Sequence, residues 1–516
     1  MRSEKRSHSV GLSLNRVSTD LVDYSGKAGI PRFDLTTELC AVFQAVGYFN
    51  TCIYRDLSTI NDFGPQPSLY LLPLSHLHTV AQCPHYLTSI FVCTTLTHRI
   101  NRIRNLSPCH ALLQEFYRYR SIALRALNED ISANRQRSGD LIIAGIINLL
   151  LSDAQIGTFS DWRMHQEGVQ RIIALRGGIR ALAGQKQLGP LLNCFLSISV
   201  LGNTTCPASD LTNTEQHLEE LEFILKEHGS GLSPFQICPP HLFAEMVKIN
   251  NLRTQVFQSE VSTELSEEAS SILEQIGSFS PERWAEQKPR GHEDWELIGR
   301  IYQNAVSIYC ISSCQSLSIL PLSERLKDKL TCHGQLLHTL LSQAVSVAKT
   351  QRLVTWPLVV LGVQAVYGGV AQRDFVAKQL QEMSRYVGTT VPLVAKGFLE
   401  KFWASDETRW DACFDRPYAF ATQIAVDNLP SGLSSSDAAS AVTEARAREF
   451  LASMRTKDVE SSASMTLGSS DEVALIQKVE LEERELQSAP SSCVIHVTVQ
   501  MTNISPLLLP WRGLTA

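Results

Sequence analysis

Residues 149–182 constrain the fold more than any other stretch, because they specify two successive helices within a short distance. An apolar run over residues 141–151 predicts the first helix, and a polar loop follows it. Ser160 and Asp161 can accept the unpaired N–H groups at the start of a second helix. We therefore predict a helix, a short loop and a second helix that begins at Trp162.

In the second helix, the residues predicted to be buried recur at three- and four-residue steps, so they lie on one face. The residues on this face are Trp162, His165, Val169, Ile172, Ile173 and Arg176. Gly168 has no side chain and would let another helix approach closely. Gly177 and Gly178 predict the end of the helix, since the residue after a helix commonly adopts a left-handed conformation that glycine takes without steric cost.

His165 is a candidate metal ligand or catalytic base. No cysteine, aspartate or second histidine stands at metal or triad spacing beside it. A single histidine on an apolar helix face is usually a hydrogen-bonded core residue. We therefore interpret His165 as structural.

Two blocks of the sequence resemble the regulatory domain of fungal binuclear zinc-cluster regulators, the fungal-specific transcription factor regulatory domain. The first block comprises Trp162, His165, Gly168, Arg176, Gly177 and Gly178. The second comprises Trp356, Pro357, Gly362, Phe375, Leu380, Gly388, Leu399 and Trp403, with Trp410 behind. The resemblance covers about residues 36–415 and implies a large helical domain that regulates transcription in the nucleus.

The family's DNA-binding module holds two zinc ions with six closely spaced cysteines and places a helix in the major groove. No C-x2-C pair occurs in this sequence. Three explanations stay open: the module was lost, the 516-residue chain starts after it, or the protein acts through partners. The resemblance thus implies indirect or weak contact with DNA, through nuclear transcription proteins and as a homodimer or heterodimer.

Charge gives little support for direct DNA binding. The formal net charge is -6, so no overall field attracts nucleic acid. The most basic region, residues 99–137, holds eight arginines against three acidic residues, a local net charge of +5. Arg118, Arg120 and Arg125 point in different directions around a helix, so we predict a solvated face rather than a phosphate-binding stripe.

Thirteen cysteines stand in scattered apolar contexts without a signal peptide, which indicates a reducing intracellular compartment. Cys310, Cys314, Cys332, His333 and His338 are candidate zinc ligands. Structural zinc sites usually show two tight pairs, whereas the first two cysteines here are one helical turn apart in an apolar helix. Core packing of free thiols is the favoured interpretation.

Residues 353–372 carry no charge over a length that can span a bilayer. Pro357, Gly362 and two glutamines lower the hydrophobicity of this segment. We therefore expect a helix buried at the centre of a large bundle, and no contact with a membrane.

The domain organisation follows from periodicity and composition. Residues 1–34 lack periodicity and are predicted to be a disordered tail, while residues 35–420 form an all-α array of antiparallel helices. Residues 421–516 are a Ser-rich and acidic tail with short helices. The strand-like residues 493–500 have no assignable partner strand.

Motifs for catalysis are missing from the sequence. No GxGxxG, Walker-type GK[ST] or GxSxG motif occurs, and no aspartate-rich motif could hold magnesium. We predict a protein that is not an enzyme and needs no cofactor.

The first hypothesis is a nuclear regulator of RNA polymerase II transcription whose helical domain receives a small-molecule or protein signal. The alternative is a helical scaffold or interaction protein outside the nucleus.

Overall fold

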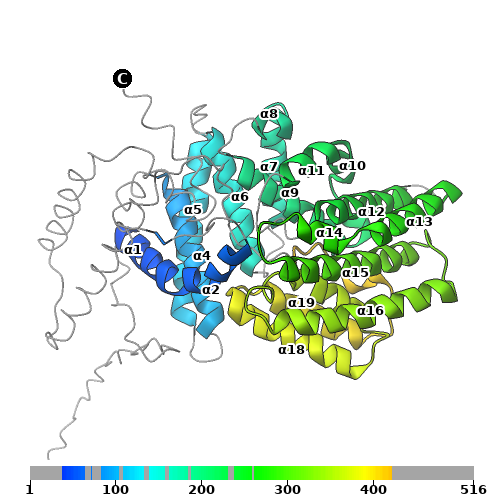
Figure 1. The fold of residues 1–516 in the computed structure, drawn as a ribbon. Helices are drawn as coiled ribbons and strands as arrows, with labels where there is room; N and C mark the ends of the chain where they lie inside the picture. Colours follow the sequence, from blue (N-terminus) through cyan, green and yellow to red (C-terminus); the bar gives the residue numbers. More distant parts are fainter. Residues whose placement is uncertain are drawn as a thin grey trace, which may run out of the picture.

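The computed structural model describes residues 38–63, 71–72, 83–103, 109–132, 139–156, 162–183, 188–229, 238–258 and 261–420. Within these ranges the chain forms helices and no strands, which confirms the predicted all-α class (Figure 1). The predicted tails, residues 1–34 and 421–516, and the strand-like residues 493–500 lie outside the described ranges.

The N-terminal part of the domain is built on three helices that pack against one another, α4, α5 and α6 (Figure 1). Their bounds, with those of the elements before them, are α1 Glu38–Tyr48, the π-helical η1 Phe49–Ile53, α2 Tyr54–Leu57, the 3-10 helix η2 Ser58–Phe63, α4 His85–Ile103, α5 His110–Ser132 and α6 Gly139–Ile156. A small apolar cluster joins α1 to α4 and α5, and it includes Phe49, Phe91 and Phe116.

The middle of the chain forms a series of helices that includes two long ones, α12 and α13. Their bounds are α7 Trp162–Leu175, α8 Ile179–Ala183, α9 Gly189–Thr204, η5 Ala208–Asp210, α10 Thr214–Glu219, α11 Leu221–Gly229, α12 Pro240–Gln258, α13 Thr263–Ser278 and α14 Pro281–Glu286. Helix α14 begins after Ser280, whose hydroxyl accepts the N–H of Arg283, and Pro281 follows in the first turn.

The C-terminal part surrounds α15, which packs against α12, α13, α14, α16, α17 and α20 (Figure 1). The bounds are α15 His292–Ser316, α16 Glu324–Val345, α17 Thr355–Gln364, α18 Val370–Val387, α19 Val391–Trp403 and α20 Trp410–Cys413. One large apolar cluster runs from α4 and α6 through α15 and α17 to α19. The N-terminal and C-terminal parts therefore share a core.

The uncharged segment 353–372 is a central buried helix over only part of its length. Every residue of α17, Thr355–Gln364, is buried, as predicted for a helix at the centre of a bundle. The helix then ends, and Gly369 takes a φ of +80° directly before α18 begins. No helix among the described residues is long and apolar enough to cross a membrane.

The helix pair predicted from residues 149–182 is confirmed, with two corrections. Helix α6 continues past the predicted polar boundary to Ile156, and α7 begins at Trp162 as predicted. Gly168 does not admit a neighbouring helix, because a β-carbon built there meets no atom within 4 Å. The close approach occurs at Gly202 of α9, where a β-carbon would lie 2.8 Å from Cη2 of Trp162.

Gly177 and Gly178 end α7 as predicted. Their φ angles are +90° and +89°. The N–H of Gly178 donates to the carbonyl of Ile173 at 2.9 Å, and the N–H of Gly177 donates to that of Ala174 at 3.2 Å. These two bonds are the pattern of a Schellman motif, which satisfies carbonyls at the helix end.

Gly177→Val should lower the free energy of unfolding by at least about 1–2 kcal/mol, because a branched side chain is strained at a positive φ. Chemical denaturation of the purified protein measures this change. Gly168→Val is the matched control, since Gly168 is helical and a β-carbon there meets open space. Equal stability of the Gly177→Val and Gly168→Val variants would contradict a left-handed cap.

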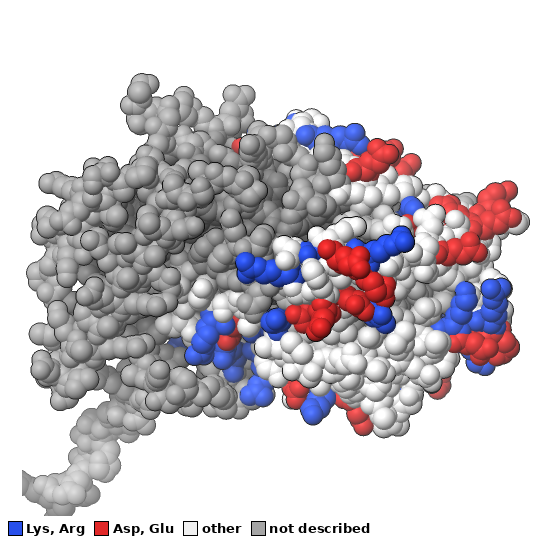
Figure 2. All heavy atoms as spheres, in the orientation of Figure 1, with Lys and Arg blue, Asp and Glu red and all other residues white. Residues whose placement is uncertain are grey.

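Charged groups of both signs lie on the described part of the face drawn in Figure 2. On the face in Figure 2, basic and acidic side chains alternate, and neither sign forms a continuous field. Three of the arginines in the basic region pair with carboxylates: Arg102 with Asp56, Arg118 with Glu115 and Arg120 with Asp153. Because carboxylates of the same domain already pair with these three guanidinium groups, the groups are less able to attract phosphate.

Candidate functional site

The two sequence blocks meet at the C-terminal end of α9. The indole N–H of Trp356 donates to the hydroxyl of Thr204 at 2.7 Å, and that of Trp410 donates to the carbonyl of the same residue at 2.9 Å. Two residues earlier, the ring of Trp162 lies over Gly202. The last turn of α9 is thus the point where α7, α17 and α20 converge. We name Gly202–Cys206 the α9 hub.

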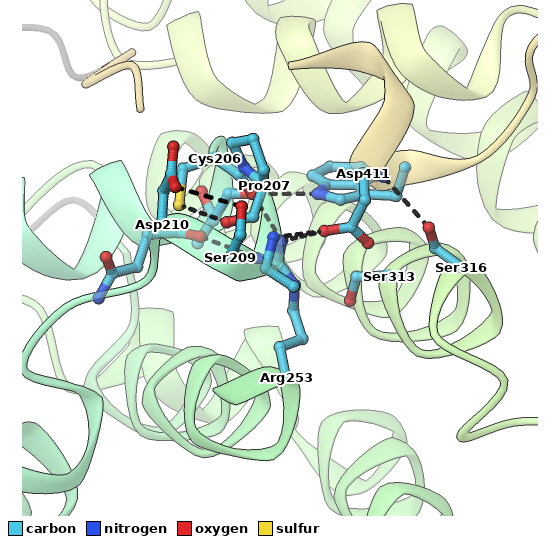
Figure 3. A network of polar contacts seen from close by, with 12 residues as sticks. Cys206, Pro207, Ser209, Asp210, Arg253, Ser313, Ser316 and Asp411 are labelled. Atoms are coloured by element: carbon cyan, nitrogen blue, oxygen red, sulfur yellow. Dashed lines mark hydrogen bonds and ion pairs between the residues drawn. The ribbon is translucent and has the colours of Figure 1, made fainter. Parts of the chain in front are cut away.

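Arg253 of α12 binds the α9 hub from the interior (Figure 3). This side chain is fully buried. Its Nη1 donates to the carbonyl of Asn203 at 2.8 Å, and its Nη2 donates to the carbonyl of Cys206 at 2.6 Å. A buried positive charge therefore lies at the C-terminal end of α9, where it interacts favourably with the negative end of the helix dipole.

The same guanidinium extends the network to α15 and α20. Nη1 donates to the hydroxyl of Tyr309 at 3.0 Å. Nη2 donates to Oδ1 of Asp411 at 2.8 Å (Figure 3). Oδ1 of Asp411 also accepts the N–H of Ala208 at 2.9 Å. Arg253 and Asp411 thus fix the turn after α9 to three helices that are far apart in the sequence.

The environment keeps Arg253 charged. Burial alone would lower its pKa, but the neighbouring Tyr309 and Asp411 outweigh burial, and the pKa is raised. The network offers hydrogen-bond donors and one carboxylate that is already paired. Its bonds join helices that are far apart in the sequence, as in a structural or conformational joint.

The first block forms a second buried polar cluster around Asp153 of α6. This carboxylate is fully buried, and it accepts two bonds from Arg120 at 2.8 Å each and one from Nε2 of His165 at 3.0 Å. Burial would raise the pKa of Asp153, but the bonds from Arg120 and His165 lower it below its usual value. His165 is hydrogen-bonded as predicted, although the sequence interpretation missed its partner twelve residues upstream. Arg176 pairs with Asp140, which ties the end of α7 to the start of α6.

The second block holds α17 against α19. Trp356 and Pro357 are buried in the first turn of α17. The indole of Trp403 donates to the carbonyl of Gly362 at 2.8 Å. A β-carbon on Gly362 would overlap Leu399, so this glycine is the place where the two helices touch. These residues of the second block therefore pack two helices together.

Comparison with known proteins agrees with this geometry. Residues 46–420 match a family described as the fungal specific transcription factor domain. The chain belongs to this family. It is 44% identical over 384 residues to a phomenoic acid biosynthesis cluster-specific transcriptional regulator of Leptosphaeria maculans (strain JN3 / isolate v23.1.3 / race Av1-4-5-6-7-8), covering 73% of this chain and 74% of the relative. No solved structure matches the chain significantly.

The matched family confirms the resemblance predicted from the two blocks, and the match covers almost all described helices. In this fungal transcription factor domain, the hydrophobic helix α17 and the α9 hub lie at the centre of the fold. Sequence reasoning identified Trp356 and Trp162 but neither Thr204 nor Arg253. The signal that the sequence offered for Arg253 was a single arginine in an amphipathic helix, and such an arginine ordinarily lies on the solvated polar face.

The candidate zinc ligands of the fungal transcription factor domain are not assembled into a site. Cys310 and Cys314 are buried in α15, whereas Cys332 is exposed on α16. Nδ1 of His333 lies 2.8 Å from Oδ1 of Asn304, and the ring of His338 contacts Phe375. No group of three or more metal-ligating side chains occurs within the described ranges. The two buried thiols pack in the core, as the spacing argument favoured.

Two buried histidines make stability of the domain depend on pH. Burial lowers the pKa of His217 to about 4, and burial together with the charge of Arg352 lowers that of His98 to about 3. Both values lie below the value of an unfolded histidine, about 6.5. The unfolded chain therefore binds more protons below pH 6.5, and stability falls as the pH falls from there toward 4.

At pH 5 each of these histidines should cost about 2 kcal/mol of stability relative to pH 7. Urea unfolding at a series of pH values measures the loss. His217→Gln should remove about half of the loss, and His292→Gln is the control because His292 is exposed. A pH profile that is identical in the His217→Gln variant and the wild type would contradict the assigned role.

Proposed function

We propose that this chain regulates RNA polymerase II transcription of a biosynthetic gene cluster in the nucleus. The observation that carries the proposal is the 44% identity, along 73% of the chain, to a relative whose name states a cluster-specific regulator. The buried centre supports it, since its residues bind each other rather than a reacting group. The helical domain would then regulate transcription by changing the arrangement of its helices and the proteins that it binds.

Deletion of the gene followed by RNA sequencing tests the regulatory part of this proposal. We expect lower expression of one contiguous group of biosynthetic genes, with most other transcripts unchanged. Restoring the intact gene should restore that group. Unchanged transcripts in the deletion strain, under conditions in which the intact strain makes the protein, would reject cluster regulation.

Imaging of a tagged protein distinguishes the regulator from a scaffold. A regulator should accumulate in the nucleus in at least one growth condition. Exclusion from the nucleus under every condition would favour the helical scaffold outside the nucleus.

We also propose that DNA is contacted only weakly or through a partner, another nuclear protein with a zinc-cluster module. Mixed surface charge and the pairing of Arg102, Arg118 and Arg120 with carboxylates support this view. Direct affinity for duplex DNA should then fall in the non-specific range of roughly 10⁻⁴ to 10⁻⁶ M at physiological salt. Selection from random duplexes should yield a motif only when the partner is added. A reproducible motif selected by this chain alone would contradict the proposal.

We further propose that the domain responds to a small-molecule effector. Such a response requires a ligand that favours one arrangement of the helices over another. The α9 hub supports the idea, because a shift of α12, α15 or α20 there moves the other two through Arg253 and Asp411.

A further inference from the structure

An unpaired buried cation lies at the junction between the N-terminal and C-terminal parts of the domain. Arg352 stands three residues before α17, and only 6% of its surface is exposed. Its Nε and Nη1 are buried without a hydrogen-bond partner among the described residues. Desolvating a guanidinium without a partner is strongly unfavourable, so such a group is suited to bind an anion.

The nearby carboxylate does not fill this role, because it is already engaged. Asp56 pairs with Arg102, whereas Nε2 of His98 lies 3.8 Å from its Oδ2, which is beyond hydrogen-bond distance. Arg352 itself is influenced by burial and then by the positive charge of Arg102, which together lower its pKa to about 10. After burial, the positive charge of Arg352 is the second cause that lowers the pKa of His98. The junction thus holds more positive charge than its described acidic group balances.

Further hydrogen-bond donors at this junction also lack partners within the described part of the chain. They are Nε2 of His98, Oγ1 of Thr59 and Nε1 of Trp295. When the Tyr48 hydroxyl donates to Nδ1 of His98, 3.1 Å away, Nε2 of that ring carries the proton. All of these free groups can donate, and an anion accepts from donors.

Contacts between their elements bring these groups to one region of the domain. The ring of Phe63, at the end of η2, lies 5.0 Å from that of Trp295 in α15. The hydroxyl of Tyr302, two turns along α15, donates to the carbonyl of Leu353 at 3.2 Å. Thus η2, α4, the start of α15 and the segment before α17 surround the same junction.

We propose that Arg352 binds the oxyanion of a small organic ligand, either a carboxylate or a phosphate group, at the junction of α4, α15 and α17. The planar guanidinium presents two parallel N–H groups that match such an oxyanion. The flanking Leu353 and Val354 belong to the large apolar cluster, so the surroundings of the guanidinium are apolar. A surface acidic peptide is less suitable, because Arg352 is almost wholly enclosed.

This inference rests on the proposed function, since it assigns the chemistry of the effector. A ligand at Arg352 would touch the segment that leads into α17 and would face α4, which packs on α18. It would therefore stabilise one arrangement of the two parts of the domain. Its binding is measured on the purified protein, whereas regulation is measured in cells, so the two proposals can fail separately.

Thermal unfolding of the purified full chain tests the site with simple probes. Sodium acetate and sodium phosphate are titrated at ionic strength matched with sodium chloride, and neutral acetamide is a further control. We expect the unfolding midpoint to rise and to saturate with at least one of the two anions. Acetate as the stronger probe would assign a carboxylate, and phosphate as the stronger probe would assign a phosphate group.

The variant Arg352→Gln should weaken the anion response about 10-fold or more, because a hydrogen bond to a charged group is lost. Arg385→Gln removes an exposed arginine of α18 and should keep the wild-type response. Arg352→Lys keeps the charge without the two-pronged geometry, and it provides the comparison if the glutamine variant does not fold.

Two results would overturn the proposal. One is a wild-type midpoint that follows ionic strength alone, with no saturable effect of acetate or phosphate. The other is a full anion response in a folded Arg352→Gln or Arg352→Lys variant. A response lost in the Arg352 variants and kept in Arg385→Gln supports the site.

Discussion

Asp411→Ala should lower the free energy of unfolding by about 3–5 kcal/mol, because removal of one partner leaves a buried charge without compensation. Arg253 is fully buried and donates to Oδ1 of Asp411 at 2.8 Å. The substitution also removes the acceptor of the Ala208 N–H. The α9 hub would then lose its connection to α20, although the carbonyls of Asn203 and Cys206 would still bind the guanidinium.

Equilibrium unfolding in urea measures the effect of Asp411→Ala. Glu407→Ala is the matched control, since Glu407 pairs with Arg409 at the exposed start of the same region and should alter the midpoint little. The double variant Arg253→Met/Asp411→Ala removes both charges and should recover part of the loss. An Asp411→Ala variant as stable as the wild type would show that the ion pair does not hold the α9 hub.

Local signals in the sequence predicted the helix ends well, because a helix start or stop depends on residues that are neighbours in the chain. The helix start at Trp162 and the stop at Gly177 both follow from groups within a few residues along the chain. The absence of charge over residues 353–372 likewise predicted that α17 is central. The family resemblance extended these local predictions to a domain, and the match over residues 46–420 confirmed it.

The polar joints were not predictable from local pattern, because their partners are far apart in the sequence. Arg253 and Asp411 are separated by 158 residues, and Trp356 and Thr204 by 152. Helical periodicity tells which face of α12 is polar, but it does not tell that one polar residue of that helix is fully buried. The unpaired Arg352 escaped notice for the same reason, since a charged residue at a helix approach is ordinarily solvated.

The two glycines near Trp162 show where sequence reasoning failed. Gly168 lies in the motif itself and was expected to accept a neighbouring helix, yet it faces open space. Gly202 lies on α9, far along the chain, and it is the residue that the indole covers. Periodicity identified the buried face of α7 correctly, but which helix covers that face depends on tertiary packing.

Trp162→Ala should destabilise the domain by about 3–5 kcal/mol, through lost burial and the cavity that remains. The side chain is 5% exposed and belongs to the large apolar cluster. Met164→Ala is the matched control on the same helix, because Met164 is 66% exposed. Thermal unfolding should therefore show a lower midpoint for the tryptophan variant only. An unchanged midpoint for Trp162→Ala would mean that α7 does not pack on α9 through this ring.

A double-mutant cycle with Gly202 tests that contact directly. In the wild-type background, Gly202→Ala should destabilise the domain by about 1–3 kcal/mol, since the new methyl group collides with the ring. The distance from that methyl position to Cη2 of Trp162 is only 2.8 Å. In the Trp162→Ala background the collision is gone, and alanine also has the higher helix propensity, so Gly202→Ala should be neutral or stabilising. Costs that simply add in the double variant would show that the indole and Gly202 are not in contact, and would separate the first sequence block from the α9 hub.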